Sequence, residues 1–79
     1  MYGKIRLCDM RPGESGHVFS VSEESGISGR LRDLGLVKGT MVECVMKSPL
    51  GDPTAYFIRG ALIALRCDDA KYILIERLG

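Results

Sequence analysis

The sequence predicts an all-β fold, a small barrel of five or six short strands with a single short helix. Short apolar runs that alternate with polar residues recur along the chain, and turns rich in glycine and proline separate them. One stretch carries apolar residues at helical spacing instead. Because the chain has 79 residues, we expect one domain, residues 1–79, that curls to reduce its exposed strand edges.

The helix is predicted at about residues 23–34. Ile27, Leu31 and Leu34 stand at i, i+4 and i+7, so their side chains line one face, which we expect to pack on a sheet. Gly35 follows at the position where helices commonly stop with a left-handed residue. Leu36 is then the apolar residue that closes such a stop, and a turn leads into the next strand.

Apolar runs, most of them alternating with polar residues, predict five or six short strands, with candidates at residues 5–7, 16–21, 40–47, 54–59, 61–66 and 71–77. Residues 67–70 are expected as a short helical turn or a loop. In the second strand Phe19 and Val21 share a face and are expected in the core. In the third strand Val42, Cys44 and Met46 form the apolar face.

Composition and charge narrow the function classes. Hydrophobic residues make up 46% and charged residues 27%, which is ordinary for a globular domain. The net charge of +1, from 11 basic and 10 acidic residues, argues against nucleic-acid binding, which normally shows a basic excess. The longest apolar run, residues 61–65, is far short of the roughly 20 residues of a membrane span. The first residues lack the apolar core of a signal peptide, so we expect a cytosolic protein.

The three cysteines, Cys8, Cys44 and Cys67, are widely spaced and odd in number. Neither a disulfide framework nor a paired zinc motif matches this pattern. We interpret each cysteine as a small buried or half-buried hydrophobe, and His17, the single histidine, as an exposed strand residue. A metal-responsive sensor or iron-binding module acting through Cys or His nevertheless stays open as an alternative function.

No catalytic constellation is present in the sequence. There is one histidine, no nucleophile motif and no phosphate-binding glycine motif, so we expect no enzyme activity and no cofactor. The loop at residues 48–53 holds two prolines and an apolar tip residue, Leu50. Leu50 is either a docking element on a rigid loop or a side chain that folds back on the sheet.

Four groups of residues together resemble the ferrous iron transport protein A (FeoA) family, and the resemblance covers about residues 5–75. The groups are Leu7, Met10, Gly13, Gly16 and Val18; Arg30-Leu31, Leu34-Gly35-Leu36, Gly39-Thr40 and Val42; Ser48-Pro49-Leu50-Gly51-Asp52-Pro53; and Ala64-Leu65-Arg66, Ala70 and Ile73. The resemblance implies an SH3-like barrel related to the C-terminal domain of iron-dependent repressors. It also implies a cytosolic, non-enzymatic accessory protein of bacterial ferrous iron uptake that acts on the membrane transporter FeoB, which carries a GTP-binding domain.

The predicted partner-binding surface combines the polar helix face with the proline-bounded loop. Exposed arginines and apolar anchors are typical of interface hot spots. The candidate residues are Arg30, Arg32, Pro49, Leu50 and Gly51. The expected partner is the cytoplasmic side of the FeoB transporter, with no nucleic acid and with the membrane reached only through the transporter. An exposed strand edge also leaves a weak homodimer open.

Overall fold

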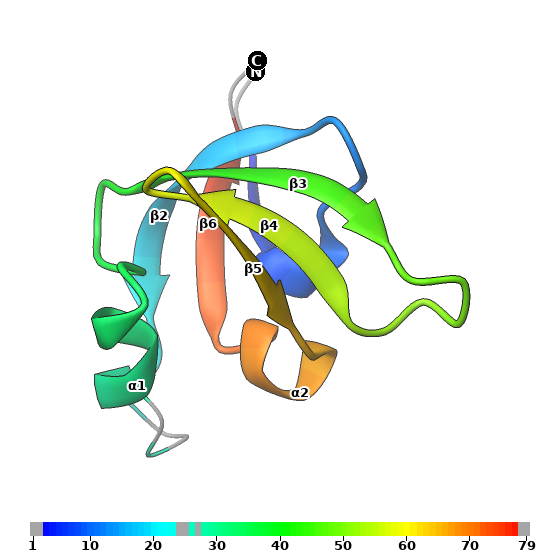
Figure 1. The fold of residues 1–79 in the computed structure, drawn as a ribbon. Coiled ribbons are helices and arrows are strands. Elements are labelled where there is room, and N and C mark those ends of the chain that lie inside the picture. The colour runs from blue at the N-terminus through cyan, green and yellow to red at the C-terminus, as the bar shows by residue number, and fades with distance from the viewer. Residues whose placement is uncertain (1–2, 24–25, 27, 78–79) are drawn as a thin grey trace.

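In the computed structural model, which describes residues 3–23, 26 and 28–77, six antiparallel strands form one curled sheet (Figure 1). Its strand order is β1-β6-β2-β3-β4-β5. The elements are β1 (Lys4–Arg6), the 3₁₀ turn η1 (Leu7–Asp9), β2 (Ser15–Val21), α1 (Ser28–Asp33), β3 (Met41–Lys47), β4 (Thr54–Ile58), β5 (Ala61–Leu65), α2 (Cys67–Ala70) and β6 (Ile73–Arg77). The prediction of a mainly β fold with five or six strands is confirmed.

The buried side chains lie inside the curl of the sheet. They come from every strand except β1 and also from η1, α1 and α2. The core residues are Leu7, Met10, Val18, Leu31, Leu36, Val42, Cys44, Tyr56, Ile58, Leu65, Ala70, Ile73 and Ile75. Pairing of β1 with β6 joins the two ends of the described chain, where the Arg77 backbone N–H donates to the Gly3 carbonyl at 3.0 Å.

Two β-bulges change which side chains of β2 and β3 face the core. Val18 pairs with Ile75, but Ser20 pairs with Leu74, so Phe19 is the extra residue of a bulge. The prediction of Phe19 in the core is therefore wrong, because the residue is 39% exposed. The Lys4 ammonium lies over its ring, 4.5 Å from the centroid. Val21 is half-buried against the core, as predicted.

The second bulge lies in β3, where the pairing with β4 shifts between Cys44 and Met46. Val42 and Cys44, which precede the shift, are buried as predicted. Met46, which follows it, is exposed, so its predicted place on the apolar face is wrong. A bulge adds one residue to one strand, and this reverses the alternation beyond it.

Helix α1 ends as the sequence predicts but begins later. The Leu36 N–H donates to the Leu31 carbonyl at 3.0 Å and the Gly35 N–H to the Arg32 carbonyl at 2.9 Å, the two bonds of a Schellman stop. Gly35 has φ +96, a left-handed conformation that favours glycine. The helix begins at Ser28, because Gly26 precedes it in a non-helical conformation. The predicted part at residues 24, 25 and 27 lies outside the described residues.

Tyr56 connects β4 to η1 through the core. Its hydroxyl donates to the Leu7 carbonyl at 3.1 Å, and burial raises the pKa of the phenol. We expect Tyr56→Phe to lower the free energy of unfolding by about 1 kcal/mol, because the Leu7 carbonyl loses one of its two donors and keeps only the Met10 N–H, 3.1 Å away. Urea denaturation would measure this, with Tyr72→Phe, at a half-buried site, as the control. Equal losses in both variants would contradict the role of this hydrogen bond.

Candidate partner-binding surface

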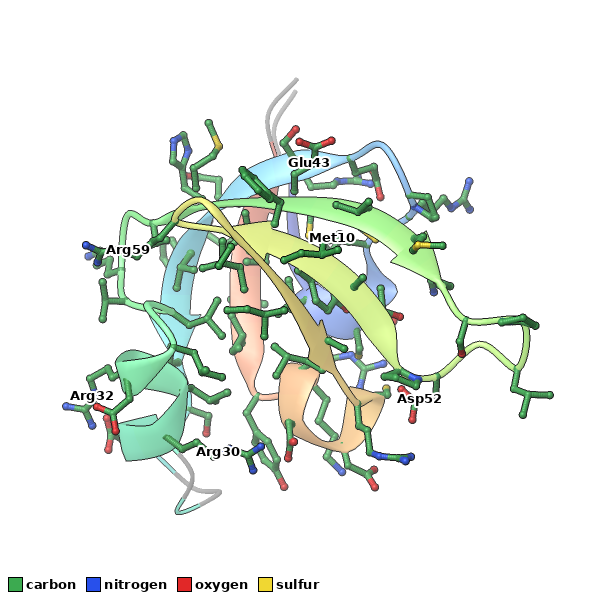
Figure 2. All side chains as sticks on the ribbon, viewed as in Figure 1. Met10, Arg30, Arg32, Glu43, Asp52 and Arg59 are labelled. Carbon is green, nitrogen blue, oxygen red and sulfur yellow. The ribbon has the colours of Figure 1, made fainter. Side chains whose placement is uncertain are left out.

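A groove of about 550 Å³ opens on the outer face of β3 and β4. Two of its lining side chains are labelled in Figure 2, Glu43 at the top of the sheet and Arg59 to its left. The complete lining is Ser15, Thr40, Met41, Glu43, Phe57, Arg59 and Gly60. Its size is within the range of sites that take a small molecule or a few side chains of a peptide.

The turn between β4 and β5 forms one edge of the groove, because Arg59 and Gly60 belong to this turn. Arg59 and Gly60 have φ +50 and +83, and Ile58 pairs with Ala61 across them, so this is a two-residue turn of type I′. A Cβ added to Gly35 would lie 2.5 Å from Cδ of Arg59. The Arg59 side chain therefore reaches from the turn across the end of α1, and the glycine at that helix stop leaves room for it.

The floor of the groove is apolar and accessible. Phe57 is 46% and Met41 48% exposed. On neighbouring strands Phe57 lies directly opposite Glu43 on one side and opposite Leu62, 61% exposed, on the other. Exposed apolar side chains that lie side by side on neighbouring strands, such as Phe57 and Leu62, are typical of protein-binding surfaces. Glu43 and Arg59 line the same groove, so a carboxylate and a guanidinium lie beside its apolar residues.

The residues predicted for partner binding lie at two separate places. Arg30 and Arg32 are exposed on α1, as Figure 2 shows, and the Arg32 guanidinium lies 3.9 Å from the Glu23 carboxylate. Arg32 also lines a second, smaller groove of about 200 Å³ beside Val37 and Lys38. Pro49, Leu50 and Gly51 form the exposed loop between β3 and β4, which Figure 1 shows on the opposite side of the molecule from α1.

The position of Leu50 decides between the two alternatives for this loop. The Gly51 N–H donates to the Ser48 carbonyl at 2.8 Å, and the Ser48 N–H to the Pro53 carbonyl at 3.1 Å. These bonds hold a projecting turn, and Leu50 at its tip is 95% exposed. Folding back on the sheet is therefore wrong, whereas docking on a partner stays a prediction.

The sequence analysis missed the groove residues Met41, Phe57 and Arg59. The available signal was an apolar residue on the polar face of a strand, since Met41 and Phe57 fall on the sides opposite to the core residues of β3 and β4. That signal does not show that the two side chains meet. Their proximity depends on the pairing of β3 with β4, which brings Glu43 opposite Phe57.

The cysteines differ in environment. Cys44 is buried and Cys8 half-buried, as predicted, but Cys67 is exposed at the first residue of α2, so its predicted burial is wrong. His17 lies in β2 as predicted, although it is half-buried instead of exposed. Within the described ranges, no group of three or more His, Cys, Asp or Glu side chains is arranged to hold a metal ion.

Among the described residues, none of the helices has the length and hydrophobicity needed to cross a bilayer.

Solved structures with this fold support its classification. A FeoA-like protein from Clostridium acetobutylicum matches with a TM-score of 0.90 at 34% identity, over 96% of this chain and 88% of that one. The FeoA of Stenotrophomonas maltophilia, an SH3 domain protein solved with zinc, matches with a TM-score of 0.78 at 33% identity, over 90% and 88%. A manganese-dependent transcriptional repressor shares the fold alone, with a TM-score of 0.86 at 16% identity over 99% of this chain and 44% of that one.

The fold thus defines the class of protein as a small SH3-like β-barrel. The FeoA domain model matches residues 5–77, and the chain belongs to this family. FeoA proteins are non-enzymatic accessory proteins of iron transport. A curated relative from Porphyromonas gingivalis, an Fe(2+) transport protein A/Fe(2+) transporter FeoB fusion protein, is 29% identical over 72 residues. The match covers 91% of this chain but only 8% of that relative's length.

Proposed function

We propose that this chain is a cytosolic accessory module that binds the cytoplasmic part of a FeoB-type ferrous iron transporter and regulates it. The observation that carries the proposal is the fusion protein of Porphyromonas gingivalis, in which a similar domain and a FeoB transporter share one polypeptide. Fusion keeps two proteins at high effective concentration, which favours partners that act together.

The groove is the part of the molecule best suited to the contact. Phe57 and Met41 supply an apolar floor, and the charges of Glu43 and Arg59 lie at its sides. A partner segment with an apolar side chain between a basic and an acidic residue would match this arrangement. Partner aromatic or aliphatic anchors in such a pocket carry a large share of binding energy.

Two further contacts are proposed at the residues expected from the sequence. Leu50, with Pro49 and Gly51, offers an exposed apolar tip, and Arg30 with Arg32 offers a basic helix face. Because these lie on opposite sides of the barrel, a small partner segment cannot cover both together with the groove. The loop and the helix face are therefore two separate contacts, and each needs its own variants as a test.

The test is a titration of the purified chain against the cytoplasmic portion and the full-length FeoB of the same organism, with and without nucleotide. We expect saturable binding, and Phe57→Asp should weaken it at least about tenfold, because a carboxylate in the apolar floor is poorly solvated when the partner covers it. Met46→Asp is the matched control, since Met46 is an exposed apolar residue of β3 outside the groove. It should bind like the unmodified chain.

Equal weakening by Phe57→Asp and Met46→Asp would remove the groove from the proposal. Leu50→Asp and the double variant Arg30→Glu, Arg32→Glu test the other two contacts in the same titration. Absence of binding to FeoB in every nucleotide state, by a chain that circular dichroism shows to be folded, would overturn the proposed function itself.

A metal-responsive module acting through Cys or His is the second candidate. The observation that favours it is the zinc complex of the Stenotrophomonas maltophilia relative. Calorimetric titration of the reduced chain with ferrous and zinc ions tests it, and the absence of saturable binding would remove it.

A further inference from the structure

The two edges of the curled sheet differ in their protection against pairing with another strand. In the described sheet β1 and β5 are the edge strands. β1 is short and carries two exposed charged side chains, Lys4 and Arg6, which oppose the addition of a further strand. β5 has the sequence Ala-Leu-Ile-Ala-Leu, without a charge or a proline. The edge at β5 is therefore the one that can accept another strand.

The outer backbone groups of β5 are unpaired. Because Ile58 pairs with Ala61 across a two-residue turn, alternate residues from Ala61 onward direct their N–H and C=O groups toward β4. Leu62 and Ala64, which lie between them, direct these groups away from β4. Within the described part of the chain no hydrogen bond reaches them. Figure 1 shows β5 at the front of the barrel, and β4 is its one neighbour in the sheet.

The side chains along this edge are apolar and accessible. Leu62, which is 61% exposed, and Ala64, which is also exposed, lie on the outer face of the sheet. Ile63 between them is half-buried against the core. Phe57 stands directly opposite Leu62, so apolar surface extends from the groove to the last strand. An occupant of the edge must therefore supply both backbone hydrogen bonds and apolar side chains.

A second copy of the same strand meets both requirements. In an antiparallel pair centred on Ile63, Leu62 of each copy lies opposite Ala64 of the other. These are the residues whose backbone groups point outward, so every outer N–H and C=O of the pair finds a partner. The large leucine meets the small alanine at both symmetric positions, which leaves room on the outer face. One register thus suits backbone and side chains in both copies, as a two-fold contact requires.

The charges at the two ends of β5 fit the same register. Arg66, just past the strand, would lie opposite Gly60 of the second copy and therefore faces no second cation. Arg59, in the turn before the strand, would come to the level of the first turn of α2 in that copy. This turn carries Asp68 and Asp69. Opposite charges are thus brought together at both ends of the paired strands.

We propose that two copies of this chain associate through β5, in an antiparallel pairing centred on Ile63 that continues the sheet from one molecule into the other.

The pairing fixes how the two grooves are oriented. Residues directly opposite each other in an antiparallel pair point to the same face of the sheet. The outer faces of the two copies, with Phe57 in each groove, therefore lie on one side of the dimer. If the groove binds FeoB, which rests on the proposed function, the dimer can hold two partner segments at once. The association through β5 does not depend on that function.

Sedimentation equilibrium of the full chain tests the association. Reducing agent is included, because the exposed Cys67 could otherwise form disulfide dimers. We expect the mean mass to rise with concentration from that of the monomer toward twice that value. A single pair of short strands makes a small, reversible contact, so the dissociation constant should be on the order of 100 µM. A chain that stays monomeric at about 1 mM would overturn the proposal.

Amide hydrogen exchange at low and high concentration locates the contact. The N–H groups of Leu62 and Ala64 should exchange several-fold more slowly in the concentrated sample. Those of Ile63 and Leu65, which already pair with β4, should change little. Slower exchange along β1, with Leu62 and Ala64 unchanged, would contradict the assignment to β5.

Ala64→Pro is the decisive variant. Proline has no N–H, but that of Ala64 points away from β4, so the barrel keeps its own hydrogen bonds. Association should weaken at least about tenfold, because the contact between copies loses backbone bonds. Ala64→Lys should weaken it similarly by placing a charge on the edge, without restricting the backbone.

Ser20→Lys is the matched control, since Ser20 is a small exposed residue of β2, away from both edges of the sheet. It should associate like the unmodified chain. Circular dichroism checks that each variant is folded. Undiminished association of the folded Ala64 variants, or an equal loss in Ser20→Lys, would rule out pairing through β5.

Discussion

Replacing Gly16 by alanine is expected to lower the free energy of unfolding by about 3 kcal/mol. An added Cβ at this position would lie 2.5 Å from the Glu76 carbonyl oxygen and 2.5 Å from Cγ2 of Ile75. The first of these atoms belongs to the backbone of β6, which pairs with β2 along its length. One methyl group therefore forces β2 and β6 apart where Gly16 pairs with Arg77, and a domain of this size has little stability to lose.

Gly13→Ala is the matched control for that result. Gly13 has φ +95, but an added Cβ there would meet nothing within 4 Å. Its cost should stay near 1 kcal/mol, the strain of a left-handed residue alone. Urea denaturation of both variants separates the two effects. Similar losses in the two variants would show that β2 and β6 can move apart at little cost. That result would contradict the claim that the close approach at Gly16 excludes a methyl group.

The second large effect is expected at the corner between α1 and β3. Leu36→Ala should lower the free energy of unfolding by about 3 kcal/mol, because truncating a fully buried leucine leaves a cavity. Leu36 also provides the apolar contact of the Schellman stop, together with the buried Leu31. Its loss should therefore loosen α1 as well as the core.

Thermal and urea denaturation followed by circular dichroism would measure this change, with Leu62→Ala as control. Leu62 is an exposed leucine of β5, so its truncation should change the stability by less than about 0.5 kcal/mol. Amide hydrogen exchange of α1 gives a second readout. Unchanged protection of α1 in Leu36→Ala would mean that the helix stop does not depend on the leucine.

Much of this fold can be predicted from the sequence because its signals are local. Alternating apolar residues place each strand, and Gly35 before Leu36 places the helix end. The errors at Phe19 and Met46 have one physical cause. A bulge is set by how a strand pairs with its neighbour, so the alternation within the strand itself does not reveal it.

The candidate surface was less accessible to sequence reasoning for a related reason. Leu50 could be recognised as a potential anchor because its loop is bounded by prolines, a local feature. The groove forms only when Glu43, Phe57 and Arg59, from different segments, are brought together by strand pairing and a left-handed turn.

The hydrogen bond between Gly3 and Arg77 has a mechanical consequence. Because the first and last described residues are held side by side, any polypeptide extending from either one leaves the barrel at the same point. If the barrel were fused to another domain, it could rotate about this one point of attachment. The groove would then rotate with the barrel around that point. A short connection would then suffice to keep the groove within reach of a neighbouring domain while leaving its strands undisturbed.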